Sequence, residues 1–243
     1  MRNVGRGMTR LSTITWGPEK FRVGPWHADG RVAYLAVGSH TFRPSPTGIG
    51  AVLERLRRDG FARVVTGALR PQEVPAFLAS GFAERERLVV LSRPIHRDEP
   101  SPTIAVRRCR PTEMDQVVRV DHAAFAPPWQ LDVAGIRDAM AATPRSRLRL
   151  VTSPALGGAV AGYAVCGRAG RTGYLQRLAV DPTVHGHGLG RALLADALGW
   201  LARWRATEVL VNTQETNRRA IDVYLSAGFR ADRSELIVLE RDL

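Results

Sequence analysis

A glycine-rich turn between an apolar strand and an amphipathic helix is the feature that most constrains this chain. Aliphatic residues run up to Val180 and stop at Asp181-Pro182, and residues 185–190 then carry glycine at every second position. From Leu189 onward, apolar residues recur at helical spacing. Glycine leaves the backbone uncovered, so N–H groups at the helix start can converge on one anion, which the helix dipole also attracts. The sequence therefore predicts a phosphate-binding loop.

The spacing of these glycines excludes two common nucleotide-binding loops. The segment lacks the Gly-Lys-Ser/Thr of nucleotide triphosphatases, and it lacks the G-x-G-x-x-G of dinucleotide-binding folds. Residues 185–190, His-Gly-His-Gly-Leu-Gly, instead resemble the acetyl-CoA loop Q/R-x-x-G-x-G/A of the GNAT (GCN5-related N-acetyltransferase) superfamily. The first position departs from that pattern, because His185 stands where the family has Gln or Arg.

A second motif strengthens the resemblance. Residues 217–229 read Asn-x-x-Ala-x-x-x-Tyr-x-x-x-Gly-Phe, which is similar to a later helix of the same superfamily, and a strand-like segment at 208–212 separates the two motifs. The resemblance covers residues 103–243. It implies a mixed α/β (α+β) sheet fold with the element order β-α-α-β-β-β-α-β-α-β-β.

The resemblance also implies where acetyl-CoA, the acetyl-donor substrate, would lie. Its pantetheine arm would pair with a strand edge and its pyrophosphate would meet the glycine loop, where we expect a loop histidine to donate to phosphate. The residues implied in cofactor binding are Leu178, Ala179, Val180, His185, Gly186, His187, Gly188, Leu189, Gly190, Arg191, Asn217 and Tyr224. Tyr224 is the implied catalytic acid for the departing thiolate, because a phenol stays protonated at neutral pH.

The general base and the acceptor stay open. Many relatives carry a glutamate where this chain has Tyr174 or Asn212, so proton removal could pass through water held by these residues with Gln176 and Gln214, or the amine could arrive neutral. His122 and Trp129 are further candidates on the acceptor side. The acceptor could be a protein N-terminus, a lysine or a small-molecule amine, each attacked directly in a ternary complex. A non-catalytic acyl-CoA-binding regulatory or partner-binding protein is the alternative.

The charge balance is strongly basic. The chain has 35 Lys and Arg against 23 Asp and Glu, a net charge of +12, and Lys20 is its only lysine. Arginines cluster at residues 55–58, 107–110, 145–149 and 203–205. Both an arginine-biased surface and a nucleic-acid or acidic partner fit this composition, and no nucleic-acid-binding motif decides between them.

Other features point to an intracellular protein. Cys109 and Cys166 have neither metal nor redox spacing, and no signal peptide or membrane span is recognisable, so we expect a cytoplasmic location without membrane association. His185 and His187 have no acidic or cysteine partner at ligand spacing, so no metal is expected.

The first half resembles a reduced copy of the second. Residues 79–82 align with residues 226–229, which puts Phe77 opposite Tyr224 and Arg70 opposite Asn217. We therefore expect a tandem architecture: a degenerate GNAT-like unit at 1–93, a proline-rich linker at 94–102 and a catalytic GNAT domain at 103–243.

Local patterns predict the elements of both halves. In the first half, residues 1–10 form a tail and a turn lies at 27–30; strands are expected at 19–26, 31–38, 63–69 and 84–92, and helices at 48–58 and 71–79. In the second, helices are expected at 111–124 and 131–142, and strands at 103–108, 147–152, 158–167 and 173–180.

Overall fold

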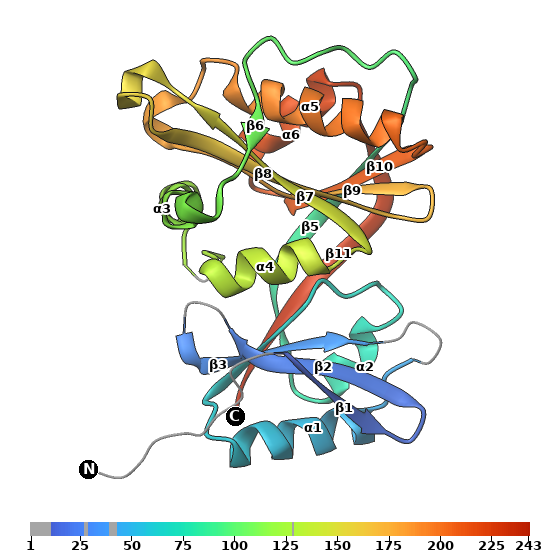
Figure 1. Ribbon diagram of the computed structural model, residues 1–243. Coiled ribbons are helices and arrows are strands. Elements are labelled where there is room, and N and C mark those ends of the chain that lie inside the picture. Colours follow the sequence, from blue (N-terminus) through green and yellow to red (C-terminus); the bar gives the residue numbers. More distant parts are fainter. Residues whose placement is uncertain (1–10, 27–28, 39–42, 128) are drawn as a thin grey trace, which may run out of the picture. The chain divides into compact units, whose positions relative to one another are not determined.

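The chain forms two compact units, which share the strands β5 (Ala83–Pro94) and β11 (Arg230–Asp242). The computed structural model describes residues 11–26, 29–38, 43–127 and 129–243 (Figure 1). Unit 1 comprises Met1–Val89 with Arg233–Leu243, and unit 2 comprises Val90–Asp232. This division differs from the expected one, because the end of the chain belongs to the first unit. The expected tail at 1–10 and part of the turn at 27–30 lie outside the described residues.

Unit 1 is a sheet with two helices. Its strand order is β1-β2-β3-β4-β11-β5. The elements are β1 (Ser12–Trp16), β2 (Glu19–Trp26), β3 (Asp29–Val37), α1 (Pro46–Arg58), β4 (Arg63–Thr66) and α2 (Val74–Ala79). The strand β1 was not predicted.

Side-chain hydrogen bonds determine where the unit 1 helices begin. The Ser45 hydroxyl accepts from the Gly48 N–H at 3.0 Å and begins α1 just before Pro46. The second helix begins later than expected, at Val74, because the Glu73 carboxylate accepts from the Arg70 N–H at 2.8 Å and holds residues 70–73 as a turn. The core of the unit consists of apolar residues from both helices and the sheet, including Phe21, Leu35, Ile49, Leu56, Phe77 and Leu239.

Unit 2 follows the expected element order as far as α6 (Arg218–Ser226), after which the described chain has one strand, β11, where two were expected. Its strand order is β5-β10-β9-β8-β7-β6. The elements are β6 (Arg107–Arg108), α3 (Met114–Ala124), α4 (Val133–Ala141), β7 (Arg145–Thr152), β8 (Val160–Ala169), β9 (Thr172–Val180), α5 (Leu189–Arg203), β10 (Glu208–Gln214) and α6 (Arg218–Ser226), with short 3₁₀ turns at Pro111–Glu113, Pro154–Leu156 and Pro182–Val184.

The strand expected at 103–108 is much shorter in the structure. Only Arg107 and Arg108 pair with β7, opposite Leu150 and Arg149. The residues before them leave the sheet edge and approach the glycine loop, since a Cβ atom built on Gly188 would lie 3.8 Å from Cδ1 of Ile104. The alternating pattern of 103–106 therefore belongs to an extended segment outside the sheet.

Helices cover both faces of the unit 2 sheet. Figure 1 shows α3 and α4 on one face and α5 and α6 on the other. Val120 and Ile136 pack with Leu150 and Tyr163 to form the core on the α3/α4 side. On the other side, Gly173 leaves room for Leu201 of α5, because a Cβ atom there would lie 2.5 Å from Cδ1 of that leucine. Among the residues that the structure describes, no helix combines the length and apolarity needed to cross a membrane.

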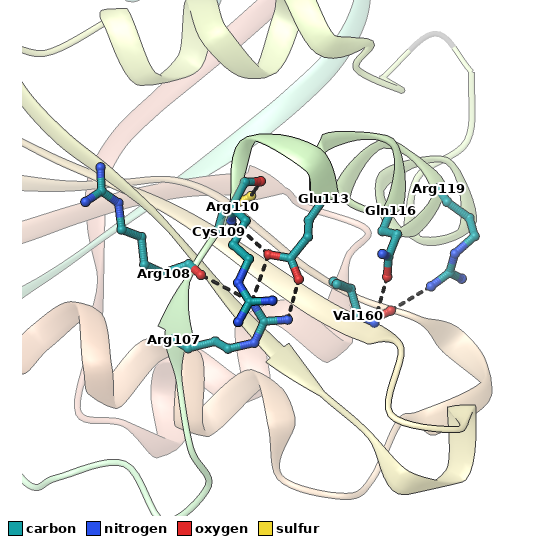
Figure 2. Close-up of polar contacts among 8 residues, drawn as sticks. All are labelled: Arg107, Arg108, Cys109, Arg110, Glu113, Gln116, Arg119 and Val160. Carbon is teal, nitrogen blue, oxygen red and sulfur yellow. Dashed lines mark hydrogen bonds and ion pairs between the residues drawn. The ribbon is translucent and has the colours of Figure 1, made fainter.

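Arginine and glutamine side chains fasten α3 to the sheet (Figure 2). Arg107 donates to both carboxylate oxygens of Glu113, at 2.6 and 2.8 Å, at the start of the helix. Further along, Gln116 accepts from the Val160 N–H at 3.2 Å and Arg119 donates to the Val160 carbonyl at 2.6 Å. These bonds fix the first part of α3, from Glu113 to Arg119. Other contacts hold its C-terminal end.

Candidate active site

The strand β9 separates from its parallel neighbour and leaves part of its edge unpaired. Pairing between β10 and β9 covers Glu208 to Leu210 and ends at Tyr174. The other edge of β9 stays paired with β8 as far as Val180, opposite Gly162. The two strands therefore part in the middle of the sheet, and the second half of β9 borders a gap.

The alternation of backbone hydrogen bonds between β8 and β9 decides which groups of β9 point into this gap. The Asp181 N–H donates to the Ala161 carbonyl at 2.8 Å, so these residues form a hydrogen-bonded antiparallel pair. Hydrogen-bonded and non-hydrogen-bonded pairs alternate along an antiparallel ladder. Val180 and Leu178 occupy non-hydrogen-bonded positions, so their N–H and C=O groups point away from β8. The Leu178 N–H and C=O and the Val180 N–H form a short open edge that an extended ligand can pair with, whereas the Val180 C=O is bonded to His185.

The glycine loop leads from this edge into α5. Gly186 has φ +85° and Gly188 has φ +76°, a left-handed conformation that favours glycine. The first backbone bond of α5 runs from the Ala192 N–H to the Gly188 carbonyl at 3.0 Å. The N–H groups of the preceding helical residues therefore have no partner within the helix, and together with the positive end of its dipole they can bind an anion.

The acidic residue before the loop fixes where the strand ends. Asp181 accepts from the Thr183 hydroxyl at 2.7 Å and from the Thr183 N–H at 3.1 Å, and it pairs with Arg119 at 2.8 Å. Hydrogen bonds from Thr183, together with those from Arg119, lower the pKa of this carboxyl. The charged form therefore persists at neutral pH and holds the turn at Pro182–Val184.

Both loop histidines bond to the backbone, each through one ring nitrogen. The Nε2 atom of His185 lies 3.0 Å from the Val180 carbonyl oxygen. The Nδ1 atom of His187 lies 3.0 Å from the His185 carbonyl and 3.2 Å from that of Val184. His185 thus closes the loop onto the strand end, and the backbone N–H groups remain as the anion donors.

One cavity of about 650 Å³ brings the predicted cofactor residues together. Every predicted residue except His187 borders it: Leu178, Ala179, Val180, His185, Gly186, Gly188, Leu189, Gly190, Arg191, Asn217 and Tyr224. The wall also contains residues that sequence reasoning missed, namely Ala124, Phe125, Val184, Arg219, Ala220, Asp222 and Val223. Helical periodicity could have found Ala220, which lies three positions after Asn217 and four before Tyr224.

Asn217 begins α6 and still has a free amide group. Its side-chain oxygen accepts from the Ala220 N–H at 3.2 Å as the helix N-cap. The side-chain NH₂ group has no protein partner among the described residues and remains available to a ligand in the cavity. One side chain can therefore both start the helix and donate to a ligand carbonyl.

Tyr224 lies on the cavity wall near the end of the same helix. Its side chain is 5% exposed, and its ring centroid lies 5.6 Å from that of Phe229. The hydroxyl makes no hydrogen bond within the described part of the chain. Burial raises the pKa of this phenol above its ordinary value, so it stays protonated well past neutral pH.

The predicted acceptor-side residues do not border this cavity. On β9 and β10, Tyr174 lies opposite Leu210 where the two strands part, and Asn212 is exposed beyond that point. The Gln176 amide donates to the Thr143 hydroxyl at 3.4 Å. None of these three side chains meets the cavity that Tyr224 borders.

The two candidates near the end of α3 contribute backbone groups. His122 is exposed, and its carbonyl accepts from the Gln130 amide at 3.0 Å. The Trp129 carbonyl accepts from Arg177 at 2.6 Å. Phe125, from the same connection, borders the cavity instead. Within the described ranges, no cluster of three or more His, Cys, Asp or Glu residues has the arrangement of a metal site.

Comparisons with known proteins agree with this geometry. The family model described as the acetyltransferase (GNAT) family matches residues 114–229. A mycothiol acetyltransferase of Salinispora arenicola is 31% identical over 247 residues, covering 83% of this chain and 76% of the relative. The chain belongs to the GNAT family. A mycothiol acetyltransferase of a Nocardioides species is 31% identical over 173 residues, covering 61% of this GNAT chain and 59% of the relative.

Solved structures show the same fold along most of this GNAT protein. A tandem GNAT protein from the clavulanic acid biosynthesis pathway superimposes with a TM-score of 0.65 and 16% identity, covering 92% of this chain and 78% of that one. A GCN5-related N-acetyltransferase from Sphaerobacter thermophilus gives a TM-score of 0.64 and 15% identity, covering 91% of this chain and 76% of that one. The predicted tandem GNAT-like architecture is therefore confirmed at the level of fold. As a GNAT family member, the protein is an acyltransferase that uses acetyl-CoA as co-substrate.

Proposed function

We propose that this protein transfers the acetyl group of acetyl-CoA to the primary amine of a small molecule, by direct attack in a ternary complex. The observation that carries the proposal is a single cavity that joins an open strand edge, a glycine-lined helix N-terminus and the buried Tyr224. The mycothiol acetyltransferases among the relatives support a small-molecule acceptor over a protein N-terminus or a lysine.

Each part of the cavity has a distinct task in the proposed reaction. The backbone N–H groups at the start of α5 would hold the pyrophosphate, and the open N–H and C=O groups of Leu178 would pair with the pantetheine amides. The free amide of Asn217 would donate to the same arm. These contacts involve the donor alone and place its thioester beside Tyr224.

The chemical step needs little more than positioning and two donors. The amine nitrogen forms a bond to the thioester carbonyl carbon, and the Val180 N–H donates to the oxygen as it gains charge. The carbon–sulfur bond then breaks, and Tyr224 transfers its proton to the departing sulfur. The attacking nitrogen loses its extra proton to water, because Tyr174 and Asn212 stand where many relatives carry a carboxylate.

Unit 1 has a different proposed role. Its helix end at Phe77 lacks the hydroxyl that Tyr224 supplies, and Arg70 stands at the position that aligns with Asn217. We therefore propose that unit 1 is a degenerate GNAT-like copy that does not transfer acetyl groups, and that the active site lies wholly in unit 2.

Release of free CoA tests the proposal. The purified chain is incubated with acetyl-CoA and a panel of small amines, peptides with free N-termini and lysine peptides, and acetylated products are identified by mass spectrometry. We expect turnover with a small amine that depends on Tyr224. Acetyl-CoA binding without Tyr224-dependent turnover of any acceptor would instead favour a non-catalytic acyl-CoA-binding protein.

A further inference from the structure

A buried carboxylate lies beneath the connection between α3 and α4. Asp121 is 0% exposed. Its oxygens accept from Arg177 at 2.8 and 3.0 Å, from the Leu131 N–H at 2.6 Å and from the Tyr163 hydroxyl. Burial raises the pKa of Tyr163, so this phenol keeps its proton and donates across the neutral range. The buried charge is thus fully paired and hydrogen-bonded.

Arg177 connects this carboxylate to the chain that follows α3. Its side chain is 14% exposed, and besides Asp121 it donates to the Trp129 carbonyl at 2.6 Å. The guanidinium carbon lies 3.5 Å from the ring centroid of Phe125. One arginine on β9 therefore holds the connection at Phe125, Trp129 and, through Asp121, Leu131.

Phe125 lies between this ionic cluster and the cavity. Its ring contacts the Arg177 guanidinium, and the residue also borders the cavity together with Val180 and Tyr224. The Gln130 amide donates to the Phe125 carbonyl at 3.1 Å and fixes its backbone as well. Any shift of Arg177 would therefore move a cavity wall.

Stability alone is a weak reason for such a cluster. Removing two charges from water is costly, and buried ion pairs can often be replaced by apolar residues without loss of stability. Arg177 shares its face of β9 with Ala179 and lies opposite Val165 of β8, and both of these neighbours belong to the apolar core, so a packed hydrophobic residue would suit the position. What an apolar side chain could not supply is the set of directional bonds to the α3–α4 connection.

We propose that Arg177 is a positioning residue that, through Asp121 and Phe125, fixes the wall of the cavity against which the acceptor amine is placed. This inference rests on the proposed function. It assigns the donor and the acceptor to different parts of the cavity: the open edge and the glycine loop hold acetyl-CoA, and the Phe125 wall orients the attacking amine.

The kinetic test compares the effect of a substitution on the acceptor with its effect on acetyl-CoA. Arg177→Met keeps an unbranched apolar side chain but removes every directional bond to residues 121–131. We expect the acceptor KM to rise or kcat to fall by roughly tenfold to a hundredfold, since small misplacements of a reacting group have effects of this size. The KM for acetyl-CoA should change less than about threefold, because no donor contact is removed. Arg177→Lys should recover part of the loss, as it keeps the charge without the planar fork.

A second arginine, on β6, bonds to a carboxylate at the start of α3 and provides the matched control. Arg107 makes an equivalent two-bond contact with Glu113 at the other end of α3 (Figure 2). Arg107→Met should lower stability while leaving the acceptor KM unchanged. The double variant Asp121→Asn with Arg177→Met removes both charges together and should regain stability relative to Arg177→Met, but its acceptor KM should stay raised.

Amide hydrogen exchange gives a readout that needs no turnover. In Arg177→Met, the amides of residues 125–131 should exchange faster than in the wild-type chain, whereas in Arg107→Met they should not. Unchanged exchange there, or equal effects on both substrates, would overturn the positioning role. If the wild-type chain acetylates no acceptor, the proposed function fails, and the exchange experiment still tests whether Arg177 holds the connection.

Discussion

Phe77 and Tyr224 occupy equivalent positions in two corresponding helix ends. The Phe82 N–H donates to the Phe77 carbonyl at 3.2 Å, and the Phe229 N–H donates to the Tyr224 carbonyl at 3.0 Å. The glycines between them, at positions 81 and 228, have φ values of +77° and +85°. In each helix end the aromatic ring packs against the following phenylalanine, with ring centroids 5.2 and 5.6 Å apart. The two turns differ chiefly in one hydroxyl, which supports the alignment expected from sequence.

That hydroxyl leads to the first prediction. Tyr224→Phe should lower kcat by roughly a hundredfold to ten-thousandfold, the usual contribution of a general acid, while acetyl-CoA binding and thermal stability stay close to wild type. Steady-state CoA release and calorimetric titration with acetyl-CoA measure the two effects. As a control, Phe77→Tyr adds a buried hydroxyl to the core of unit 1 and should lower stability by about 1–3 kcal/mol without raising activity. Full activity of Tyr224→Phe would remove the phenol from the mechanism.

The pH dependence of kcat follows from the burial of the same phenol. The active form is protonated, and burial raises its pKa above the ordinary value of 10.0, so loss of the acid should begin only above that pH. The alkaline limb of the wild-type profile should therefore lie higher than for an exposed tyrosine. A decline in kcat between neutral pH and pH 9 that disappears in Tyr224→Phe would contradict the raised pKa.

Two substitutions of Asn217 should separate its role as the helix N-cap from its proposed role in acetyl-CoA binding. Asn217→Asp keeps an oxygen for the Ala220 N–H but loses the side-chain NH₂ group. We expect unchanged or slightly higher stability and an acetyl-CoA affinity reduced by about twofold to tenfold, the worth of one hydrogen bond. Asn217→Ala loses both functions and should also be less stable by about 1 kcal/mol. Equal acetyl-CoA affinity in all three proteins would show that the amide does not contact the ligand.

Gly188 should be the glycine of the loop that is most sensitive to substitution. With φ +76° it adopts a conformation that costs an alanine about 1–2 kcal/mol, and an added methyl group would also crowd the anion site. Gly188→Ala should therefore lower both stability and acetyl-CoA affinity. Gly50 is the matched control, because it lies within α1 with nothing within 4 Å of an added Cβ atom. Gly50→Ala should raise stability by up to about 1 kcal/mol, and a similar gain in Gly188→Ala would contradict the strained geometry.

Glu113 should make the free energy of unfolding depend on pH in the acid range. Hydrogen bonds from Arg107 and from the Arg110 N–H lower the pKa of this carboxyl from 4.5 to about 2 in the folded chain. The depressed pKa contributes stability that is fully present above pH 4.5 and is lost as the pH falls toward about 2. Glu113→Gln should thus be less stable than wild type at neutral pH, and the difference should shrink through that window. Urea unfolding at a series of pH values measures it; a difference that does not vary with pH would argue against the ion pair.

Local sequence signals were enough to predict most elements and most of the residues that line the cavity. The glycine loop, the cap at Asn217 and the helix that carries Tyr224 depend on residues close together in the chain. The short strand β1 was missed because its five residues alternate with little hydrophobic contrast. The segment at 103–106 was wrongly predicted as a strand because alternation does not reveal whether a partner edge is free.

The buried cluster of Asp121, Tyr163 and Arg177 could not be predicted in the same way. Its members are separated by 42 and 56 positions, and each has an ordinary surface interpretation in its own element. One signal was present in the sequence: Arg177 lies two positions before Ala179, on a face of β9 that becomes buried. A charge on such a face requires a buried partner, but only the fold identifies Asp121 as that partner.

The return of the chain to unit 1 limits how the protein can be divided into separate fragments. Leu239 is fully buried in the unit 1 core, and its N–H donates to the Thr66 hydroxyl at 2.9 Å. Separating the chain at residues 94–102 would therefore deprive the N-terminal portion of its final strand. A gene fusion that exchanged the C-terminal half for another sequence would also remove Leu239 from the core of unit 1.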